Sequence, residues 1–109
     1  MRCKTIIKFS NSEDHDSLGF GRGIVQLLEG VEEYGSINKA TNAMGMAYSK
    51  AWRIINSIEA EFAVTLIERD GARGSALTDA ARELIAHYHE ALDAAENAAQ
   101  AVFRRYYTE

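Results

Sequence analysis

The sequence contains no proline, a single cysteine and no long apolar run. Average usage would give about five prolines in a chain of this length, so this residue interrupts no helix. The lone Cys3 excludes an internal disulfide and a zinc site built from several cysteines. No stretch approaches the roughly 18 apolar residues of a membrane span, and residues 1–10 lack the apolar core of a signal peptide. We therefore expect a cytoplasmic protein that has no membrane as a partner.

The charged residues are unevenly distributed along the chain. The 109 residues carry 12 Lys and Arg against 16 Asp and Glu, a formal charge of -4, which as a bulk figure argues weakly against a polyanionic partner. Residues 36–57, however, hold three cations and no acid, whereas ten of the 16 acids follow residue 58. The sequence therefore predicts a locally cationic surface in the middle of one globular domain.

Apolar residues with helical spacing predict two helices before residue 46. The first helix begins at Gly23 and ends at Gly35, with its stripe at Ile24, Leu27, Leu28 and Val31. Ser36 can cap a shorter second helix, which Gly45 closes. Its apolar positions are Ile37, Ala40, Ala43 and Met44.

A third helix is expected over residues 47–62, after a very short turn. Its buried stripe comprises Ala51, Ile54, Ile55, Ile58 and Phe62, and Trp52 flanks that stripe. The opposite face is polar and carries Ser49, Lys50, Arg53, Asn56 and Ser57. Such a face is commonly just solvated, but the acid-free window favours a nucleic-acid contact.

β-type segments are predicted at two places. Lys4–Phe9 is short, β-branched and aromatic, which is typical of a strand. Thr65–Glu68 and Ser75–Leu77, joined by a loop with Asp70, Gly71 and Gly74, are typical of a hairpin. Arg69 and Arg73 flank the tip of this hairpin, where they can meet phosphates or a minor groove.

A last helix is predicted from Ala80 to about Tyr106, with Thr78 and Asp79 at its start. Its apolar and small residues follow a heptad spacing at Ala81, Ile85, Tyr88, Leu92, Ala95, Ala99, Val102 and Tyr106. This seam could pack back on its own domain. Because a helix of about 40 Å is too long for the small domain before it, self-association is the favoured interpretation.

Three helices with a tight turn between the second and third, followed by a hairpin, match a winged helix-turn-helix. In that motif the third helix enters a major groove about 12 Å wide. Arg53 can address guanine with two hydrogen bonds and Asn56 can address adenine, while Ser49 and Lys50 can meet bases or phosphates. Trp52 could stack on a base, but its place beside the apolar stripe favours packing in the core.

No catalytic or metal-binding pattern accompanies these features. His87 and His89 point about 200° apart on a helix, so they cannot share one ion. The acids have no nucleophile or base as a partner, and Gly19–Gly23 lacks the lysine of a phosphate-binding loop. We therefore expect neither an enzyme nor a bound cofactor.

Several motifs resemble the DNA-binding domain of the molybdate-responsive regulator ModE and, more distantly, that of LysR-type regulators. They are Gly35-Ser36-Ile37-Asn38-Lys39-Ala40, Met44-Gly45-Met46-Ala47-Tyr48-Ser49-Lys50-Ala51-Trp52, Leu66-Ile67-Glu68-Arg69 and Leu77-Thr78. The resemblance covers roughly residues 18–88 and implies a dimeric winged-helix DNA binder that reads DNA with Ser49, Lys50 and Arg53. Ala47 stands where the family usually has a serine and cannot cap the recognition helix. The oxyanion-binding domains of full-length ModE are missing, so direct molybdate binding is not expected.

The sequence thus predicts a mainly α fold with a small β component over residues 1–109. Residues 1–78 would form an N-terminal strand, three helices and the predicted hairpin, which is the wing of this motif. Residues 79–107 would form a long dimerisation helix. We expect a homodimeric transcriptional regulator that binds double-stranded DNA; a helical dimer that binds a partner protein is the alternative. The expected DNA contacts are Ser36, Lys39, Tyr48, Ser49, Lys50, Arg53, Asn56, Arg69 and Arg73. The expected dimer contacts are Ile85, Tyr88, Leu92, Ala95, Ala99, Val102 and Tyr106.

Overall fold

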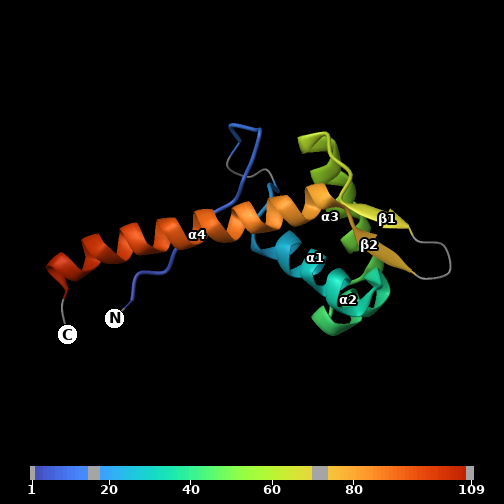
Figure 1. Ribbon diagram of the computed structural model, residues 1–109, viewed down its shortest axis with the longest axis horizontal. Helices are drawn as coiled ribbons and strands as arrows, with labels where there is room; N and C mark the ends of the chain where they lie inside the picture. Colours follow the sequence, from blue (N-terminus) through green and yellow to red (C-terminus); the bar gives the residue numbers. More distant parts are fainter. Residues whose placement is uncertain (1, 15–17, 70–73, 108–109) are drawn as a thin grey trace.

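The computed structural model describes residues 2–14, 18–69 and 74–107. The elements follow the order α1 (Arg22–Tyr34), α2 (Ile37–Met44), α3 (Tyr48–Phe62), β1 (Ile67–Arg69), β2 (Ser75–Leu77) and α4 (Asp79–Tyr106). Figure 1 shows α1, α2, α3 and the two strands gathered at one end of α4, whose other end projects away from them. The molecule is therefore elongated, with principal extents of 55 × 29 × 24 Å. This arrangement confirms the predicted fold class.

Local sequence signals set the helix ends. Gly35 and Gly45 adopt φ of 70° and 66° after α1 and α2, in the left-handed region that glycine occupies at little cost. The Ser36 hydroxyl accepts a hydrogen bond from the Lys39 N–H, and the Thr78 hydroxyl accepts one from the Ala81 N–H. These caps satisfy backbone donors that the first helical turns of α2 and α4 leave open.

The core lies between α1, α3 and the base of the hairpin. Leu27, Leu28 and Val31 of α1 are fully buried, as are Ile55 and Ile58 of α3. The helices α1 and α2 approach closely, because a Cβ added at Gly30 would lie 3.1 Å from the Ala40 Cβ. This close approach packs the short α2 directly against α1.

The hairpin is antiparallel and pairs Ile67 with Leu77, Glu68 with Ala76 and Arg69 with Ser75. Its first strand begins two residues later than predicted, because Thr65 and Leu66 belong to the connection from α3. Leu66 is fully buried there, and its N–H donates a 2.7 Å hydrogen bond to the Glu59 carboxylate of α3. The wing is thus anchored to the C-terminal end of the recognition helix.

The predicted strand at Lys4–Phe9 is wrong. Among the described residues, the backbone pairing of this segment is at Phe9, through two hydrogen bonds with Phe20 of 2.9 and 2.7 Å. The two strands of the described hairpin pair with each other, so neither of them lies beside Lys4–Phe9. It runs along α4 (Figure 1), and the Cys3 N–H donates a hydrogen bond to the Gln100 side chain.

The apolar stripe of α2 also differs from the prediction. Ala43 and Met44 are exposed, whereas Thr41 is buried together with Ile37 and Ala40. Burial of Thr41 is possible because its hydroxyl donates a 2.9 Å hydrogen bond to the Asn38 carbonyl.

Candidate nucleic-acid interface

The recognition helix α3 has one buried and one exposed face. Ala51, Ile55 and Ile58 are fully buried. The residues of the predicted DNA-binding face are all exposed, namely Ser49, Lys50, Arg53, Asn56 and Ser57. The helix therefore offers an unobstructed polar surface of side chains that can hydrogen-bond to base edges.

The start of α3 lacks a side-chain cap. Ala47 occupies the cap position, and no side chain there accepts a hydrogen bond from the first turn. The N–H groups of that turn lie beside exposed Tyr48 and Ser49. The uncapped N–H groups at this end of α3 are donors that a phosphate oxygen could accept from.

The turn between α2 and α3 is short, and Lys39 lies in the first turn of α2. The Gly45 N–H donates to the Asn42 carbonyl and the Met46 N–H to the Thr41 carbonyl, so the turn is tight. Lys39 is exposed on α2. Ser36 is half-buried and its hydroxyl already caps α2, so its established contact is within the chain.

The wing meets α3 through an aromatic residue. The Arg69 guanidinium lies 5.3 Å from the centre of the Trp52 ring, and Tyr48 packs edge-on against the same ring at 6.4 Å. Trp52 is partly buried against the core, which confirms its predicted packing role. Arg69 is therefore held at the base of the wing by a cation–π contact, a pairing that no local sequence signal indicates.

A hollow of about 240 Å³ lies between the start of α2, the start of α3 and the wing. Three predicted DNA contacts from three elements, Ser36, Tyr48 and Arg69, line this hollow together. Two further polar residues in its lining, Asn38 and Ser75, were not predicted. The full lining is Ser36, Ile37, Asn38, Tyr48, Trp52, Arg69, Gly74 and Ser75. Both missed residues have polar side chains, but their position depends on how the wing folds against α2. Arg73 lies outside the described residues.

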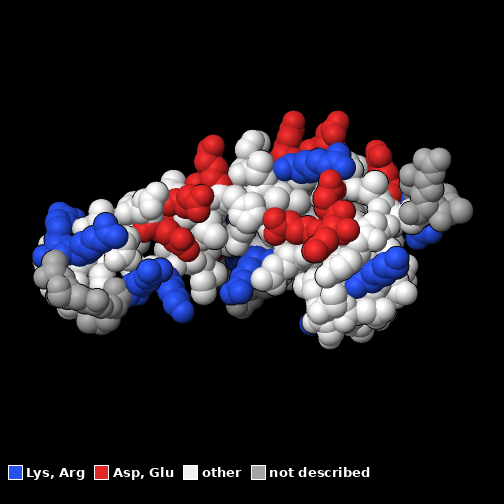
Figure 2. Space-filling model, turned by 60° about the horizontal axis from the view of Figure 1, so that its bottom comes forward, with Lys and Arg blue, Asp and Glu red and all other residues white. Residues whose placement is uncertain are grey.

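A cluster of acids lies between α1 and α4. Glu29, Glu32 and Glu33 line a separate hollow with Arg82 and Ile85, between α1 and α4. Arg82 pairs there with Glu32 at 3.3 Å, and His89 contacts Glu29 at 3.2 Å. In Figure 2 the acids gather in the middle of the molecule, and Lys and Arg cluster at the free end of α4. This cluster therefore belongs to α1 and α4, whereas the acids of α3, Glu59 and Glu61, lie in the last turn of that helix.

The predicted dimer residues divide into three groups along α4. Tyr88 is buried in its own chain, with the Phe9 and Phe20 rings 6.3 and 6.4 Å away, and is not available to a second copy. Ile85, Leu92, Ala95 and Ala99 are half-buried. Val102 and Tyr106 are 47% and 72% exposed, so the free end of the helix carries uncovered apolar surface.

Two other kinds of site are not seen. Among residues 2–14, 18–69 and 74–107, no three His, Cys, Asp or Glu side chains lie together as metal ligands would. No helix in the described part of the chain combines the length and apolar character needed to cross a membrane.

Comparison with known proteins gives the family. Residues 24–82, just over half of the chain, match the family described as "Bacterial regulatory helix-turn-helix protein, lysR family". The Bacillus subtilis (strain 168) protein "Uncharacterized HTH-type transcriptional regulator YvbU" is 37% identical over 70 residues, which cover 64% of this chain and 24% of that protein. The chain thus spans about a quarter of the length of that relative.

Solved structures with the same fold include two DNA-binding domains in complex with DNA. The CbnR domain–DNA complex has a TM-score of 0.58 at 22% identity, over 73% of this chain and 91% of that one. The complex of the BenM domain with benA site 1 DNA has a TM-score of 0.57 at 22% identity, over 75% and 94% of the two chains. The LysR-type resemblance is confirmed, whereas the resemblance to ModE stays a prediction. The chain belongs to the LysR family of bacterial regulatory helix-turn-helix proteins and carries the winged helix-turn-helix DNA-binding domain of that family.

Proposed function

We propose that this protein is a homodimeric transcriptional regulator that binds a specific site on double-stranded DNA. The observation that carries this proposal is the exposed face of α3, which is polar, cationic and free of acids, next to a wing that holds Arg69. Two solved domains with this fold are bound to DNA. As a DNA-binding regulator, the protein would act in the cytoplasm.

The proposal gives each side chain a role. Lys39, Lys50 and Arg69 neutralise phosphates, together with Arg73 beyond the described residues. Ser36 and Tyr48 line the hollow at the phosphate backbone. Base choice comes mainly from Arg53, Ser49 and Asn56. The motifs of residues 35–52 and 66–69 further favour a ModE-like mode of DNA binding.

The long helix supplies the dimer in this proposal. With 28 residues, α4 is about 42 Å long. Its half-buried and exposed seam positions from Leu92 to Tyr106 would pack against a second copy. Two recognition helices could then occupy half-sites one turn of duplex apart, about 34 Å.

The salt dependence of DNA binding tests this function. A dimer that neutralises six to ten phosphates should bind about 10³- to 10⁵-fold more weakly at 200 mM than at 50 mM salt, because binding releases counterions. Fluorescence anisotropy with a labelled duplex measures this difference. Changing Lys50 to glutamine should lower the log–log slope by about 1 for each phosphate that the lysine neutralises. Affinity that is absent at 50 mM salt, or independent of salt, would remove the DNA-binding proposal.

Arg53→Ala separates base reading from phosphate binding. The variant should bind a specific duplex about 1 to 3 kcal/mol more weakly, since alanine cannot form the bidentate hydrogen bonds to guanine. Affinity for random duplex should change little. Because Arg53 is exposed, the fold should persist, as circular dichroism would show. An equal weakening on both duplexes would identify Arg53 as a phosphate contact.

A protein-interaction module is the second candidate function. The observation in its favour is the apolar surface at the free end of α4, where Val102, Tyr106 and Tyr107 are exposed. That candidate predicts a stable dimer that binds no duplex at low salt, so the salt titration separates the two functions.

A further inference from the structure

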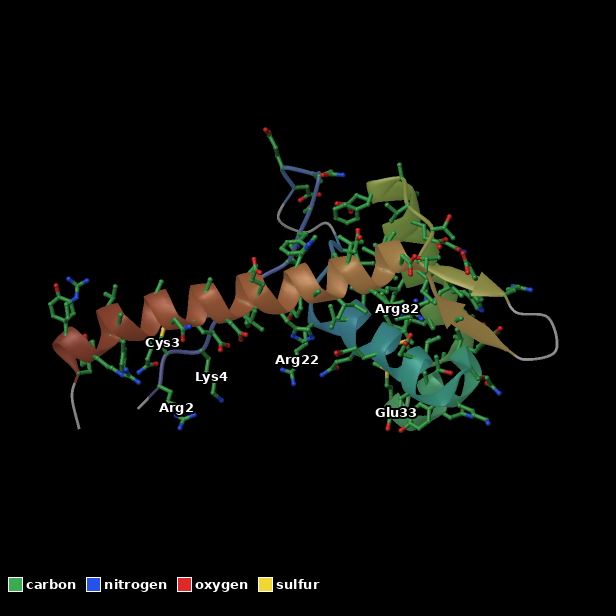
Figure 3. All side chains as sticks on the ribbon, in the orientation of Figure 1. Arg2, Cys3, Lys4, Arg22, Glu33 and Arg82 are labelled. Carbon is green, nitrogen blue, oxygen red and sulfur yellow. The ribbon has the colours of Figure 1, made fainter. Side chains whose placement is uncertain are left out.

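The N-terminal segment, Arg2–Phe9, shows the exposure pattern of an extended chain, although its one backbone pairing among the described residues is that of Phe9 with Phe20. Exposure alternates along it: Cys3, Thr5, Ile7 and Phe9 are half-buried, whereas Arg2, Lys4, Ile6 and Lys8 are exposed. This period of two is that of an extended chain with one covered face. Figure 3 shows Cys3 close to α4 and the side chains of Arg2 and Lys4 directed away from the helix.

Both ends of the N-terminal segment are fixed. The Cys3 N–H donates a 3.0 Å hydrogen bond to Gln100 Oε1, and Phe9 pairs with Phe20 beside Tyr88. The segment therefore lies along α4 from Gln100 to Tyr88. It precedes residues 24–82, which match the LysR family, so that family assignment gives it no role.

The middle of the segment has an open edge. In the described part of the chain, the backbone N–H and C=O groups of residues 4–7 make no hydrogen bond. In a strand, alternate residues direct these groups to the same edge. The bonds of Cys3 and Phe9 assign the odd-numbered residues to the edge facing α4 and Phe20. Lys4 and Ile6 therefore present their groups on the opposite edge.

Ile6 makes this open edge unusual. Its side chain is 94% exposed, the highest exposure among the large apolar residues of the structure. An exposed β-branched strand edge is a template for pairing with another chain, and soluble proteins usually blunt or cover such edges.

We propose that the N-terminal segment pairs with the same segment of a second copy, as an antiparallel two-stranded ribbon with the two-fold axis at Thr5. Lys4 then faces Ile6 of the second copy, and the two residues exchange hydrogen bonds through their open edges. Thr5 faces Thr5 of the second copy in the non-hydrogen-bonded position between them.

The charges favour this register. If the two-fold axis lay at Ile6, Lys4 of each copy would face Lys8 of the other, close to the axis. If the axis lay at Lys4, the Lys4 residues of the two copies would face each other directly. Like charges at opposed positions destabilise a strand pair. With the axis at Thr5, cations meet only at the ends, where Arg2 faces Lys8. A strand pair can fray there at little cost.

A second copy is the occupant because the segment that carries the open edge is held against α4, the helix of the proposed dimer. The segment lies beside the half of α4 that the rest of the domain leaves uncovered. The inference thus rests on the proposed homodimer and adds a specific contact to it.

Cysteine cross-linking tests the register. With Cys3 changed to serine, Thr5→Cys places two thiols on residues whose Cα atoms are about 4.5 Å apart in a non-hydrogen-bonded pair. That distance permits a disulfide. Mild oxidation should convert most of the protein to a covalent dimer on a non-reducing gel. Lys4→Cys in the same background is the control: its two Cα atoms would be about 8 Å apart, beyond disulfide reach.

Proline tests the backbone pairing. Ile6→Pro removes the N–H that the ribbon uses, while Ile6→Thr keeps it and removes the same apolar surface. We expect sedimentation equilibrium to show at least tenfold weaker dimerisation for proline and little change for threonine. Circular dichroism checks the fold, which should hold because the Ile6 side chain contacts little of the domain.

The outcomes separate this inference from the proposed function. A dimer that binds DNA with the expected salt dependence, but cross-links no better at position 5 than at position 4, overturns the ribbon alone. Cross-linking at position 5 without DNA binding supports the ribbon and contradicts the proposed function as a DNA-binding regulator. A protein that is monomeric at all concentrations overturns the ribbon and the proposed homodimer together.

Discussion

Replacing Gly74 with alanine is expected to destabilise the protein by about 2 to 4 kcal/mol. Gly74 adopts φ of 100°, a conformation that costs an L-residue about 1 to 2 kcal/mol. A Cβ at this position would also lie 2.4 Å from the Gly35 carbonyl oxygen, well inside van der Waals contact. That atom belongs to backbone and cannot turn away as a side chain could.

The same change should disturb the DNA-binding surface. The Gly35 carbonyl accepts a 3.2 Å hydrogen bond from the Ser75 N–H, which ties the wing to the turn between α1 and α2. Relief of the overlap would lengthen or break this bond. Trp52, the single tryptophan, packs beside Arg69 at the base of the wing and would report the change by fluorescence during urea unfolding.

Gly23→Ala is the matched control. This glycine lies in α1, and no atom falls within 4 Å of an added Cβ. Alanine is a better helix former by roughly 0.5 to 1 kcal/mol, so the variant should be unchanged or slightly more stable. Equal urea midpoints for the two variants would show that the approach of Gly74 to Gly35 contributes nothing to the fold.

The elements of this fold follow closely from local signals in the sequence. Glycines at positions 35 and 45 end helices in the left-handed conformation, and Ser36 and Thr78 accept the capping hydrogen bonds expected of them. The exposed face of α3 is likewise predictable, because helical periodicity separates it from the buried stripe. Each of these features depends on residues within a few positions of one another.

The features that could not be predicted depend on contacts between distant residues. Lys4–Phe9 has the composition of a strand, but a strand also needs a partner, and the described part of the chain supplies a backbone partner only for Phe9, at Phe20. The approach of Gly74 to Gly35 spans the whole helix-turn-helix. Arg69 lies over Trp52 only because the wing folds back on α3. Periodicity carries no information about any of these pairings.

Tyr88 shows how a correct period can predict a wrong contact. It lies on the heptad seam of α4, yet it is 5% exposed and packs edge-on against Phe9 and Phe20. The seam continues beyond the part of α4 that packs on the domain. Its residues are therefore buried in the core near the start of the helix and exposed near the end of the helix. Spacing alone cannot locate the point where the core stops.

Tyr88→Ala should therefore act on folding and not primarily on association. Removal of a buried aromatic side chain typically costs about 3 to 5 kcal/mol, and the absence of the edge-on packing with two rings adds to that cost. Because Phe9 packs on Tyr88, the N-terminal segment should also become accessible to protease. Urea unfolding of a dilute sample, below the dimer dissociation constant, would measure the change free of any contribution from association.

Tyr106→Ala supplies the opposite case on the same helix. Its side chain is 72% exposed, so in dilute solution the free energy of unfolding should change by less than about 0.5 kcal/mol. At higher concentration, the variant should dimerise more weakly, since Tyr106 lies in the part of the seam that the proposed dimer buries. Weaker dimerisation for Tyr88→Ala with unchanged monomer stability would contradict this division, because it would require the Tyr88 ring to leave the core and contact the second copy.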